Sequence, residues 1–445
     1  MTGAFAGERA VVIGAGVAGS AAAQVLRAGG AEVLVTEARD ADELDAGPIE
    51  EAGARVAAGG HRREHLRDAT LVVVSPGVPP SAEVLTWARA QALPIWSEME
   101  LGARVARAPY LAVTGTNGKT TTTGMLAAIL RADGLDAVAC GNIGHPFPLA
   151  ASEAHDVLVV EVSSFQLEHQ TSFHPRVSVL LNVAPDHLDA HGSFAAYVAA
   201  KARIVATAAP EDVHVGNADD PVAAEISAAA PCRRLWFRAG PPGVGEVGYE
   251  AGRLVARIDG EEDLGTLEGR APGFRADAAA AAAAALGYGA SAEAVRGGLD
   301  GFRPAPHRGE VVATVAGVRF IDDSKATNVH AARTAIAGVD DAVLIAGGRA
   351  KGQDLGPLAA DADRLRGVVA MGEAGDAVAA VFEGLVPVVR AGSIEDATRL
   401  ALGMAAPGGI VLLAPACASW DQFRDYGERG DRFAAAARAL GSDDG

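Results

Sequence analysis

The chain has 445 residues, with 38 Lys and Arg against 56 Asp and Glu, and its formal net charge is −18 at pH 7. A surface this acidic repels nucleic acid and anionic membranes, so we expect neither as a partner. Hydrophobic residues make up 49% of the chain and charged residues 21%, which excludes a disordered protein. The length predicts about two to four domains.

The three cysteines form no Cys-x-x-Cys pair, which argues against a disulfide framework or structural zinc site and favours a reducing compartment. The N-terminus lacks the basic and apolar segments of a signal peptide. No stretch has the roughly 20 strongly apolar residues that a membrane-spanning helix needs. We therefore expect a cytoplasmic protein.

Short runs of Val, Ile and Leu alternate with Ala-rich stretches along most of the chain. This alternation predicts an α/β fold, in which helices cover both faces of parallel sheets. Strands are expected at residues 10–13, 32–36, 71–75, 111–114, 157–162, 177–183, 318–321, 342–346, 368–371 and 410–414. The Gly- and Pro-rich residues 241–250 predict a hairpin or an excursion, and the tail at 441–445 is expected to fray.

Three units of strand, glycine loop and helix begin near residues 10, 111 and 318, and they predict three α/β modules. Residues 97–109 are expected to link the first module to the second. The sequence GFRPAP at 301–306 has the composition of a second boundary. The eight alanines at 278–285 predict a tightly packed helix.

The first glycine loop, GAGVAG at residues 14–19, directly follows a predicted strand. Such a loop lets the backbone approach a pyrophosphate at a helix N-terminus, and Glu37 follows the next strand, where a carboxylate could bind ribose hydroxyls. The simplest interpretation is NAD or FAD binding, and a glycine-rich turn without a ligand is the alternative. A second glycine turn, SPGV at 75–78, ends another strand at the same sheet edge.

The second glycine loop, TGTNGKTT at residues 114–121, lies between a strand and an Ala- and Leu-rich helix. Its backbone N–H groups would surround phosphates, Lys119 would neutralise the β and γ oxygens, and the Thr120 hydroxyl would hold Mg²⁺. The loop departs from the general pattern, because Val113 stands where a glycine is usual. An ordinary loop with a surface lysine is the alternative.

Glu161 and His187 follow two further strands, so with Lys119 they can converge at the carboxyl edge of one sheet, where oxygen and nitrogen ligands suit Mg²⁺. Lys201 lies within an apolar helix stripe. The stripe consists of Phe194, Tyr197, Val198, Ile204 and Val205. A lysine there either loses its proton on burial or extends its amine to solvent.

In the last module, three polar loops at residues 322–328, 347–352 and 414–421 each follow a strand. Arg308 and Lys351 add positive charge to an acidic protein, which predicts a pocket for carboxylate or phosphate. Solvated loop charges are the alternative for each residue alone.

Together these motifs resemble the Mur ligase family along essentially the whole chain. The matching segments are TGTNGKTTT (114–122), GNIG (141–144), EVSSFQLE (161–168), NVAPDHLD (182–189), DDSKATN (322–328) and PACASWDQF (415–423). The resemblance implies a Rossmann-like domain at 1–97 that binds a UDP substrate, a P-loop-type ATPase domain at 98–304, and a Rossmann-like domain at 305–445 that binds the amino acid and closes over ATP.

The resemblance further implies an ATP-dependent ligase that forms an amide bond through an acyl phosphate, with two Mg²⁺ ions. The DDSKATN segment favours addition of D-glutamate to UDP-N-acetylmuramoyl-L-alanine in cytoplasmic peptidoglycan precursor synthesis, by a monomer. Three alternatives stay open: a related Mur or folylpolyglutamate-type ligase that adds another amino acid, an NAD-dependent oxidoreductase, and a nucleotide-binding regulator without catalysis.

The family's site residues carry over by position. For the UDP substrate they are Gly14, Ala15, Gly16, Val17, Glu37, Arg39, Ser75, Pro76, Gly77 and Asn142. For ATP they are Gly115, Thr116, Asn117, Gly118, Lys119, Thr120, Thr121, Arg308 and Asp323. For the metal they are Thr120, Glu161, His187 and Lys201, with Lys201 as a CO₂-derived carbamate, and for catalysis Lys119, Glu161, His187 and Lys201. For D-glutamate they are Thr327, Lys351, Ser419, Trp420 and Tyr426.

The chain departs from the family in two places. Many relatives carry His-Asn-x-x-Asn before the Ala-rich helix, with an asparagine on the nucleotide, whereas residues 273–277 here read GFRAD. Asp277 or Arg275 is expected to substitute. Trp420 and Tyr426 stand where Leu and Phe are more usual, so the glutamate pocket is expected to differ slightly in shape.

Overall fold

The computed structural model describes residues 3–442. Its residues group into two compact units. The first comprises Met1–Val183, Ala195–Thr266 and Asp277–Phe302, and the second Ala184–Phe194, Leu267–Ala276 and Arg303–Gly445, as far as these ranges are described. Of the tail expected to fray, Gly441 and Ser442 end a helix, and residues 443–445 lie outside the described part.

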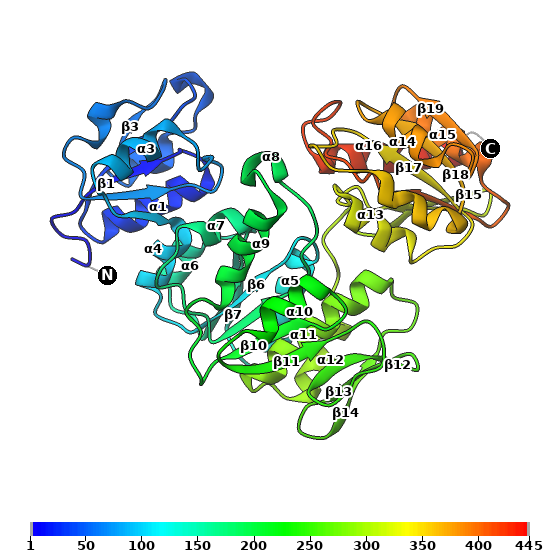
Figure 1. The fold of residues 1–445 in the computed structure, drawn as a ribbon, viewed down its shortest axis with the longest axis horizontal. Coiled ribbons are helices and arrows are strands. Elements are labelled where there is room, and N and C mark those ends of the chain that lie inside the picture. The colour runs from blue at the N-terminus through cyan, green and yellow to red at the C-terminus, as the bar shows by residue number, and fades with distance from the viewer. Residues whose placement is uncertain (1–2, 443–445) are drawn as a thin grey trace. The chain divides into compact units, whose positions relative to one another are not determined.

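The first sheet lies in the first unit and is drawn in blue in Figure 1. It is parallel throughout, with strand order β3-β2-β1-β4-β5. Its strands are β1 (Arg9–Ile13), β2 (Glu32–Thr36), β3 (Arg55–Ala57), β4 (Leu71–Val74) and β5 (Ile95–Ser97). Because strand residues alternate between faces, Val12 packs with α1 (Val17–Ala28) on one face and Val11 packs with α3 (Glu83–Ala90) on the other. The chain order reverses between β1 and β4, so the loops at 14–16 and 75–77 flank the point where such sheets bind ligands.

The expected linker at 97–109 is mostly a helix, α4 (Glu98–Val105), which the sequence analysis did not identify. The Ser97 hydroxyl starts this helix by accepting a hydrogen bond from the Glu100 N–H at 3.2 Å. Met99 and Leu101 on α4 belong to the same hydrophobic core as residues of the first and second sheets. The linker therefore packs as part of the first unit.

The second sheet also lies in the first unit and has nine strands in the order β14-β13-β12-β11-β10-β9-β6-β8-β7. They are β6 (Tyr110–Thr114), β7 (Ala137–Gly141), β8 (Val157–Glu161), β9 (Val177–Leu180), β10 (Val213–Asn217), β11 (Arg233–Phe237), β12 (Glu246–Glu250), β13 (Arg253–Arg257) and β14 (Glu261–Thr266). The strands from β7 to β12 are parallel, and β12, β13 and β14 form an antiparallel extension, so the hairpin expected near 241–250 is present.

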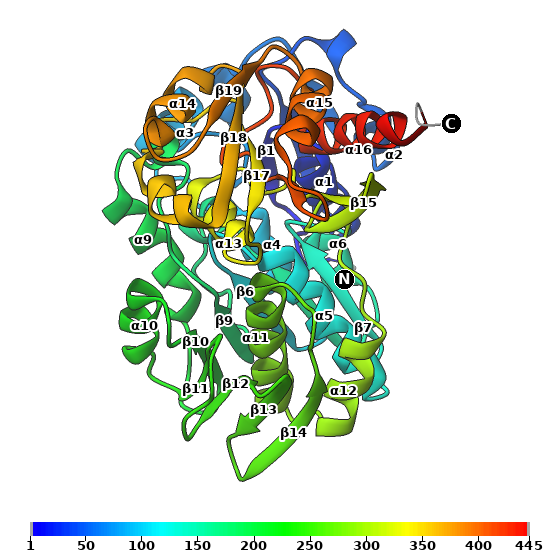
Figure 2. The same cartoon turned by 90° about the vertical axis from the view of Figure 1, so that its right-hand side faces the viewer.

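Helices α5 (Lys119–Ala132) and α12 (Ala292–Asp300) pack together beside this sheet, with α11 (Pro272–Tyr288) nearby (Figure 2). The eight alanines of α11 are completely buried, as their sequence predicted. Shorter helices occupy the connections, namely α2 (Gly47–Glu51), α6 (Phe147–Ser152), α7 (Ser164–Glu168), α8 (Leu188–His191), α9 (Phe194–Ala202) and α10 (Pro221–Ala228).

The third sheet lies in the second unit, with strand order β15-β16-β20-β17-β18-β19. It comprises β15 (Glu310–Val315), β16 (Val318–Asp322), β17 (Ala342–Gly347), β18 (Leu365–Met371), β19 (Val388–Ala391) and β20 (Ile410–Leu413). One face is covered by α13 (Val329–Ile336) and α14 (Gly375–Phe382), the other by α15 (Ile394–Met404) and α16 (Tyr426–Ser442). Because β16, β20 and β17 are adjacent and parallel, the three predicted polar loops leave one edge of this sheet.

All ten predicted strands are present, and the predicted α/β fold with helices on both faces of largely parallel sheets is confirmed. None of the helices within residues 3–442 combines the length and apolarity needed to cross a bilayer.

Candidate active site

A cavity of about 590 Å³ lies in the first unit, at the loops after β1, β2, β4 and β7. It is lined by Gly14, Gly16, Val17, Ala18, Glu37, Arg39, Ser75, Pro76, Gly77, Val78, Glu98, Met99, Gly141, Asn142, Ile143, Gly144, Pro146, Phe147 and Gln166. Every residue that the sequence analysis assigned to the UDP substrate is among them except Ala15, which belongs to the same loop. The structure therefore brings these residues together around one volume.

Glu37 organises the first glycine loop. Its Oε2 accepts hydrogen bonds from the Ala15 N–H at 2.8 Å and the Arg39 guanidinium at 3.0 Å, and its Oε1 accepts from the backbone of Ala38 and Arg39. Burial opposes ionisation, but these hydrogen bonds outweigh it and lower the pKa of Glu37 to about 2. The Ala15 N–H thus points at a carboxylate, which disfavours a pyrophosphate at that position.

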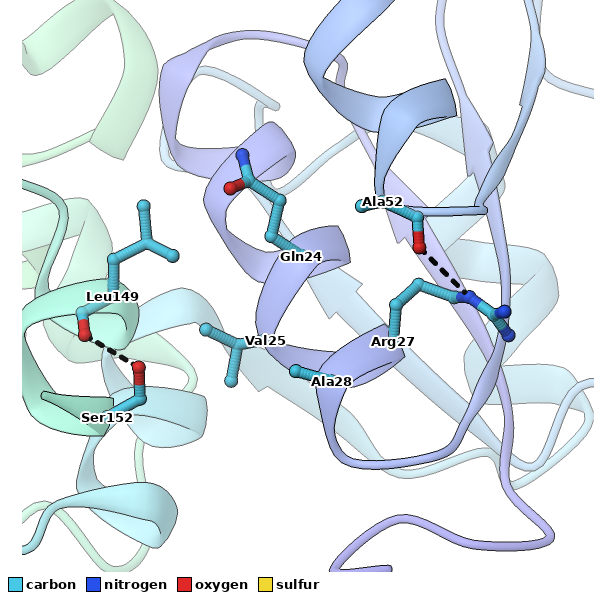
Figure 3. A pocket seen from close by; sticks show the side chains of 7 residues that line it. All are labelled: Gln24, Val25, Arg27, Ala28, Ala52, Leu149 and Ser152. Carbon is cyan, nitrogen blue, oxygen red and sulfur yellow. Dashed lines mark hydrogen bonds between the residues drawn. The ribbon is translucent and has the colours of Figure 1, made fainter. Parts of the chain in front are cut away.

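A second hollow, of about 420 Å³, lies between α1 and α6 (Figure 3). Its lining includes Gln24 and Arg27 in the C-terminal half of α1, whereas the glycine loop precedes the N-terminus of that helix. Arg27 donates to the carbonyl oxygens of Ala31 and Ala52, so its charge is directed at the backbone. No predicted site residue lines this hollow.

The phosphate loop predicted at 114–121 connects β6 to α5. Gly118 has a φ of +85°, a conformation that favours glycine. The Asn182 side chain accepts hydrogen bonds from the Thr116 and Asn117 N–H groups at 3.1 and 2.8 Å. Lys119 Nζ donates to the carbonyl oxygens of Gly115 and Thr116 at 2.9 and 2.8 Å. These hydrogen bonds hold the loop in one shape, and the Lys119 ammonium group is folded against it.

The Asp277 carboxylate lies against the phosphate loop. A Cβ atom added to Gly118 would lie only 2.2 Å from Asp277 Oδ1. Of the two residues expected to replace the family's asparagine, Asp277 therefore contacts this loop within the first unit. Arg275 belongs to the second unit, where its Nε donates to the Arg270 carbonyl oxygen at 2.7 Å.

Lys201 is only 1% exposed, so of the two alternatives that its place in the apolar stripe left open, burial is the one observed. Its Nζ donates to the Gly115 carbonyl oxygen at 2.6 Å and lies 4.8 Å from the centre of the Tyr197 ring. The alternative in which the amine extends to solvent is wrong. Tyr197 and the phosphate loop are linked as well, because its hydroxyl lies 3.0 Å from Thr116 Oγ1.

Glu161 ends β8 and is 2% exposed. Its Oε1 accepts a hydrogen bond from the Asn142 amide at 2.9 Å. Its Oε2 is buried and has no hydrogen-bond partner among residues 3–442. A buried carboxylate oxygen without a partner is costly, and a cation ligand position would account for it.

No three His, Cys, Asp or Glu side chains in the described part of the chain converge as a metal cluster. Mg²⁺ commonly takes one or two protein carboxylates and completes its shell with phosphate oxygens and water. The open Oε2 of Glu161 and the Thr120 hydroxyl at the start of α5 fit that mode of binding.

In the second unit, Lys351 forms a buried ion pair that the sequence analysis did not find. Its Nζ lies 2.9 Å from Asp186 Oδ1, and both side chains are 8% exposed. Asp186 Oδ2 accepts from the Asn328 amide at 3.1 Å. Burial opposes ionisation of Asp186, but the Lys351 charge outweighs it and lowers the pKa of that carboxyl. Asp186 also accepts from the backbone N–H of His187, so it connects the predicted metal and amino-acid residues of this unit.

Asp323 and Thr327 lie on the loop after β16, and Ser419 and Trp420 lie on the loop after β20, whereas Arg308 precedes β15 and Tyr426 begins α16. Arg429 connects the two loops. Arg429 is 1% exposed and donates to both oxygens of Ser324 and to the Cys417 carbonyl. Burial raises the pKa of Asp323 to about 7, although Arg308 opposes the shift.

The predicted D-glutamate residues on these loops differ in exposure. Ser419 is buried and Trp420 is 60% exposed. The Tyr426 ring lies under Lys325 Nζ at 3.8 Å. Thr327 belongs to the loop after β16, directly before the Asn328 that caps α13. The indole of Trp420 is thus available for contact.

Three family models match the chain: the Mur ligase MurD-like N-terminal domain over residues 8–97, the Mur ligase middle domain over 113–237, and the Mur ligase glutamate ligase domain over 307–417. A protein named UDP-N-acetylmuramoylalanine–D-glutamate ligase from Frankia casuarinae is 45% identical, over 98% of this chain and 95% of that protein. The chain belongs to the Mur ligase family. A protein of the same name from Acidobacterium capsulatum is 42% identical to this Mur ligase, over 96% of this chain and 95% of that protein.

The fold of this Mur ligase is similar to that of a MurF ligase from Thermotoga maritima, solved in complex with ADP. The TM-score is 0.61 at 17% identity, with 93% of this chain and 96% of that chain covered. The family predicted from the motifs is thereby confirmed, and the α/β fold agrees with that of a solved Mur ligase.

Proposed function

We propose that this Mur ligase joins D-glutamate to UDP-N-acetylmuramoyl-L-alanine, coupled to conversion of ATP to ADP and phosphate, in cytoplasmic peptidoglycan precursor synthesis. The relatives from Frankia casuarinae and Acidobacterium capsulatum carry the corresponding name. In this proposal residues 1–97 bind the UDP substrate, 98–304 bind ATP and Mg²⁺, and 305–445 bind the amino acid. The enzyme acts as a monomer on small molecules.

The observation that carries the proposal is the hydrogen bond between Asn142 and Glu161. Asn142 lines the cavity, and its amide donates to Glu161 at 2.9 Å. Glu161 ends β8 opposite Val113 of β6, whose next residues form the phosphate loop. A substrate in the cavity and a nucleotide on the loop would therefore meet at Glu161, as transfer of a phosphoryl group requires.

In the first step, a terminal carboxylate oxygen of the substrate attacks the γ-phosphorus of ATP. The bond to the β–γ bridging oxygen breaks, which gives an acyl phosphate and ADP. Lys119 and the N–H groups at the start of α5 stabilise the charge on the transferring group. Arg308 and Asp323 are proposed to contact ATP.

The MurF ligase with bound ADP supports a nucleotide on this fold. Thr120, Glu161, His187 and Lys201 are proposed to hold two Mg²⁺ ions, which neutralise phosphate charge when bound. Lys119 and Lys201 both donate to the Gly115 carbonyl, so their amines lie close together. In this proposal the Lys201 amine reacts with CO₂ in its neutral form, which gives an anionic carbamate.

In the second step, the D-glutamate amine attacks the acyl carbon. The carbon–nitrogen bond forms, the bond to the phosphate oxygen breaks, and the amine loses a proton. The amino acid is proposed to contact Thr327, Lys351, Ser419, Trp420 and Tyr426. Asp186 holds the Lys351 ammonium in place, so this cation is oriented before the amino acid arrives with its two carboxylates.

The test is phosphate release from ATP with UDP-N-acetylmuramoyl-L-alanine and D-glutamate, L-glutamate, L-lysine or no amino acid. We expect release with D-glutamate, and a product whose mass is that of the UDP substrate plus one glutamyl residue. Turnover with L-lysine but not with D-glutamate would show that the enzyme adds a different amino acid. Reduction of NAD by any hydroxy acid, without ATP turnover, would favour the oxidoreductase alternative.

A further inference from the structure

Glu98 lines the cavity, yet no motif of the sequence pointed to it. It is the first residue of α4 and is 3% exposed. Its Oε1 accepts a hydrogen bond from Gln166 Nε2 at 2.6 Å, and Gln166 also lines the cavity. Its Oε2 is buried and has no hydrogen-bond partner within residues 3–442. A carboxyl group in this position needs a second partner.

The orientation of Gln166 decides where a proton on Glu98 would be. The Gln166 carbonyl oxygen accepts the Ser163 N–H at 2.7 Å, which places the amide nitrogen toward Glu98. Glu98 Oε1 is therefore an acceptor, and a proton on the carboxyl resides on Oε2. The unpartnered atom is thus the one that would donate.

We propose that Glu98 is a specificity-determining residue of the cavity, which in its neutral form donates a hydrogen bond from Oε2–H to an oxygen acceptor of the substrate and in its ionised form repels that anionic substrate. This inference rests on the proposed function, because a UDP-linked substrate supplies diphosphate and amide oxygens as acceptors. Oε2 is covered in the structure, so the contact requires a turn of the carboxyl, which its broad terminal torsion permits.

Burial raises the pKa of Glu98 to about 7, although the hydrogen bond from Gln166 opposes the shift. The charged groups around it are few. Glu168 and His169 line a smaller hollow that Glu98 also lines, and Glu37 and Arg39 line the cavity. On α4 itself, Glu100 pairs with Arg104. The facing segments of α6, β4 and β5 carry no titratable residue except Glu153 at the end of α6, which bonds to histidines at the surface. Helix α1 also packs against α4, and its Arg27 donates to backbone carbonyl oxygens.

The experiment is calorimetric titration of the full chain with UDP-N-acetylmuramoyl-L-alanine, without ATP, at about pH 6 and about pH 8.5, in buffers of different ionisation enthalpy. For the unmodified protein we expect affinity to fall about tenfold or more at the higher pH. Binding there should take up close to one proton, because the ionised Glu98 must be protonated. This measurement needs no variant.

Glu98→Gln keeps a donor at every pH, so its affinity should be nearly equal at both pH values and its binding should take up no proton. Glu100→Gln is the matched control: it removes a buried carboxylate two residues away, and we expect lower thermal stability with the proton uptake retained. Proton uptake that persists in Glu98→Gln would overturn the inference.

Two outcomes separate this inference from the proposed function. Affinity of the unmodified protein that is independent of pH would overturn the role of Glu98 and leave the function standing. Absence of binding at both pH values would overturn the proposed function and the inference with it.

Discussion

Glu98 and Glu100 lie two residues apart on α4, and both are buried, but their surroundings differ. Both oxygens of Glu100 accept hydrogen bonds, from Arg104 and from the side chains and backbone of Thr171 and Ser172. Burial opposes its ionisation, but these bonds lower its pKa, whereas burial raises that of Glu98 to about 7. A carboxylate whose two oxygens both accept hydrogen bonds stabilises the fold. A buried carboxylate with an unpartnered oxygen beside a cavity indicates a ligand-binding site.

Glu161 extends this contrast, because its Oε2 also has no hydrogen-bond partner within residues 3–442, and we expect removal of its charge to cause a near-complete loss of activity. Glu161→Gln keeps the shape and the acceptor for Asn142 but removes the charge. We expect ATP-dependent phosphate release to fall about 100-fold or more, with little change in melting temperature. Phosphate release and thermal unfolding on the same sample measure both. Activity near that of the unmodified protein would end the metal-site role of Glu161.

Lys201→Ala tests the buried cation beside the phosphate loop. We expect near-complete loss of phosphate release, since the proposed carbamate cannot form, and added bicarbonate should not restore it. Lys325→Ala, which removes a lysine from a different loop, serves as a comparison for the general effect of removing a cation. Full activity of Lys201→Ala would contradict any role for this residue in the metal site.

Lys351→Ala tests the proposed role of the buried cation of the second unit in binding D-glutamate. We expect the half-saturating D-glutamate concentration to rise about tenfold or more, because the cation that Asp186 orients is gone. Acyl phosphate formation should survive, and borohydride trapping of the intermediate without D-glutamate measures it. Loss of that intermediate would show that Lys351 acts in the first step instead.

Glu100→Gln tests how much a carboxylate with two hydrogen-bonded oxygens contributes to stability. Loss of charge-assisted hydrogen bonds should reduce the free energy of unfolding by about 3 kcal/mol, measured by denaturant titration. The pKa of Glu100 is lowered in the folded state, so its stabilisation is present above the ordinary value of 4.5 and is lost as the pH falls through the folded value. Glu98 has the opposite sign: its raised pKa costs stability as the pH rises from 4.5 to about 7.

Asp277→Asn is expected to have the smallest effect. The carboxylate against Gly118 repels the phosphates of ATP, so its removal should lower the KM for ATP about threefold to tenfold. Steady-state kinetics at fixed Mg²⁺ measures the change. Glu293→Gln, in the first turn of α12, is the matched control and should leave KM unchanged. An increase in KM for Asp277→Asn would instead indicate that the carboxylate binds the nucleotide.

The sequence determined the features that depend on neighbouring residues. A strand followed by a glycine loop and a helix has a local sequence pattern, so the loops at 14–19 and 114–121 and the strands that precede them were predictable. Among the strands that were missed, β10 contains His214 and Gly216, and β11 begins with two exposed arginines, so their local signals are weak. Their strand structure depends on pairing with neighbouring strands, which local sequence does not encode.

Tertiary structure decided which buried polar groups have hydrogen-bond or ion-pair partners. Glu98 meets a partner 68 residues away in Gln166, Glu100 meets Thr171 and Ser172, and Lys351 meets Asp186. Within residues 3–442, Arg104 is the one partner that lies near either residue in the chain; the other partners of Glu98 and Glu100 are distant, and burial against different elements gives the two carboxyls opposite pKa shifts. Hydrogen-bond partners and desolvation are set by which distant segments pack together, because both depend on distance in space rather than on position in the chain.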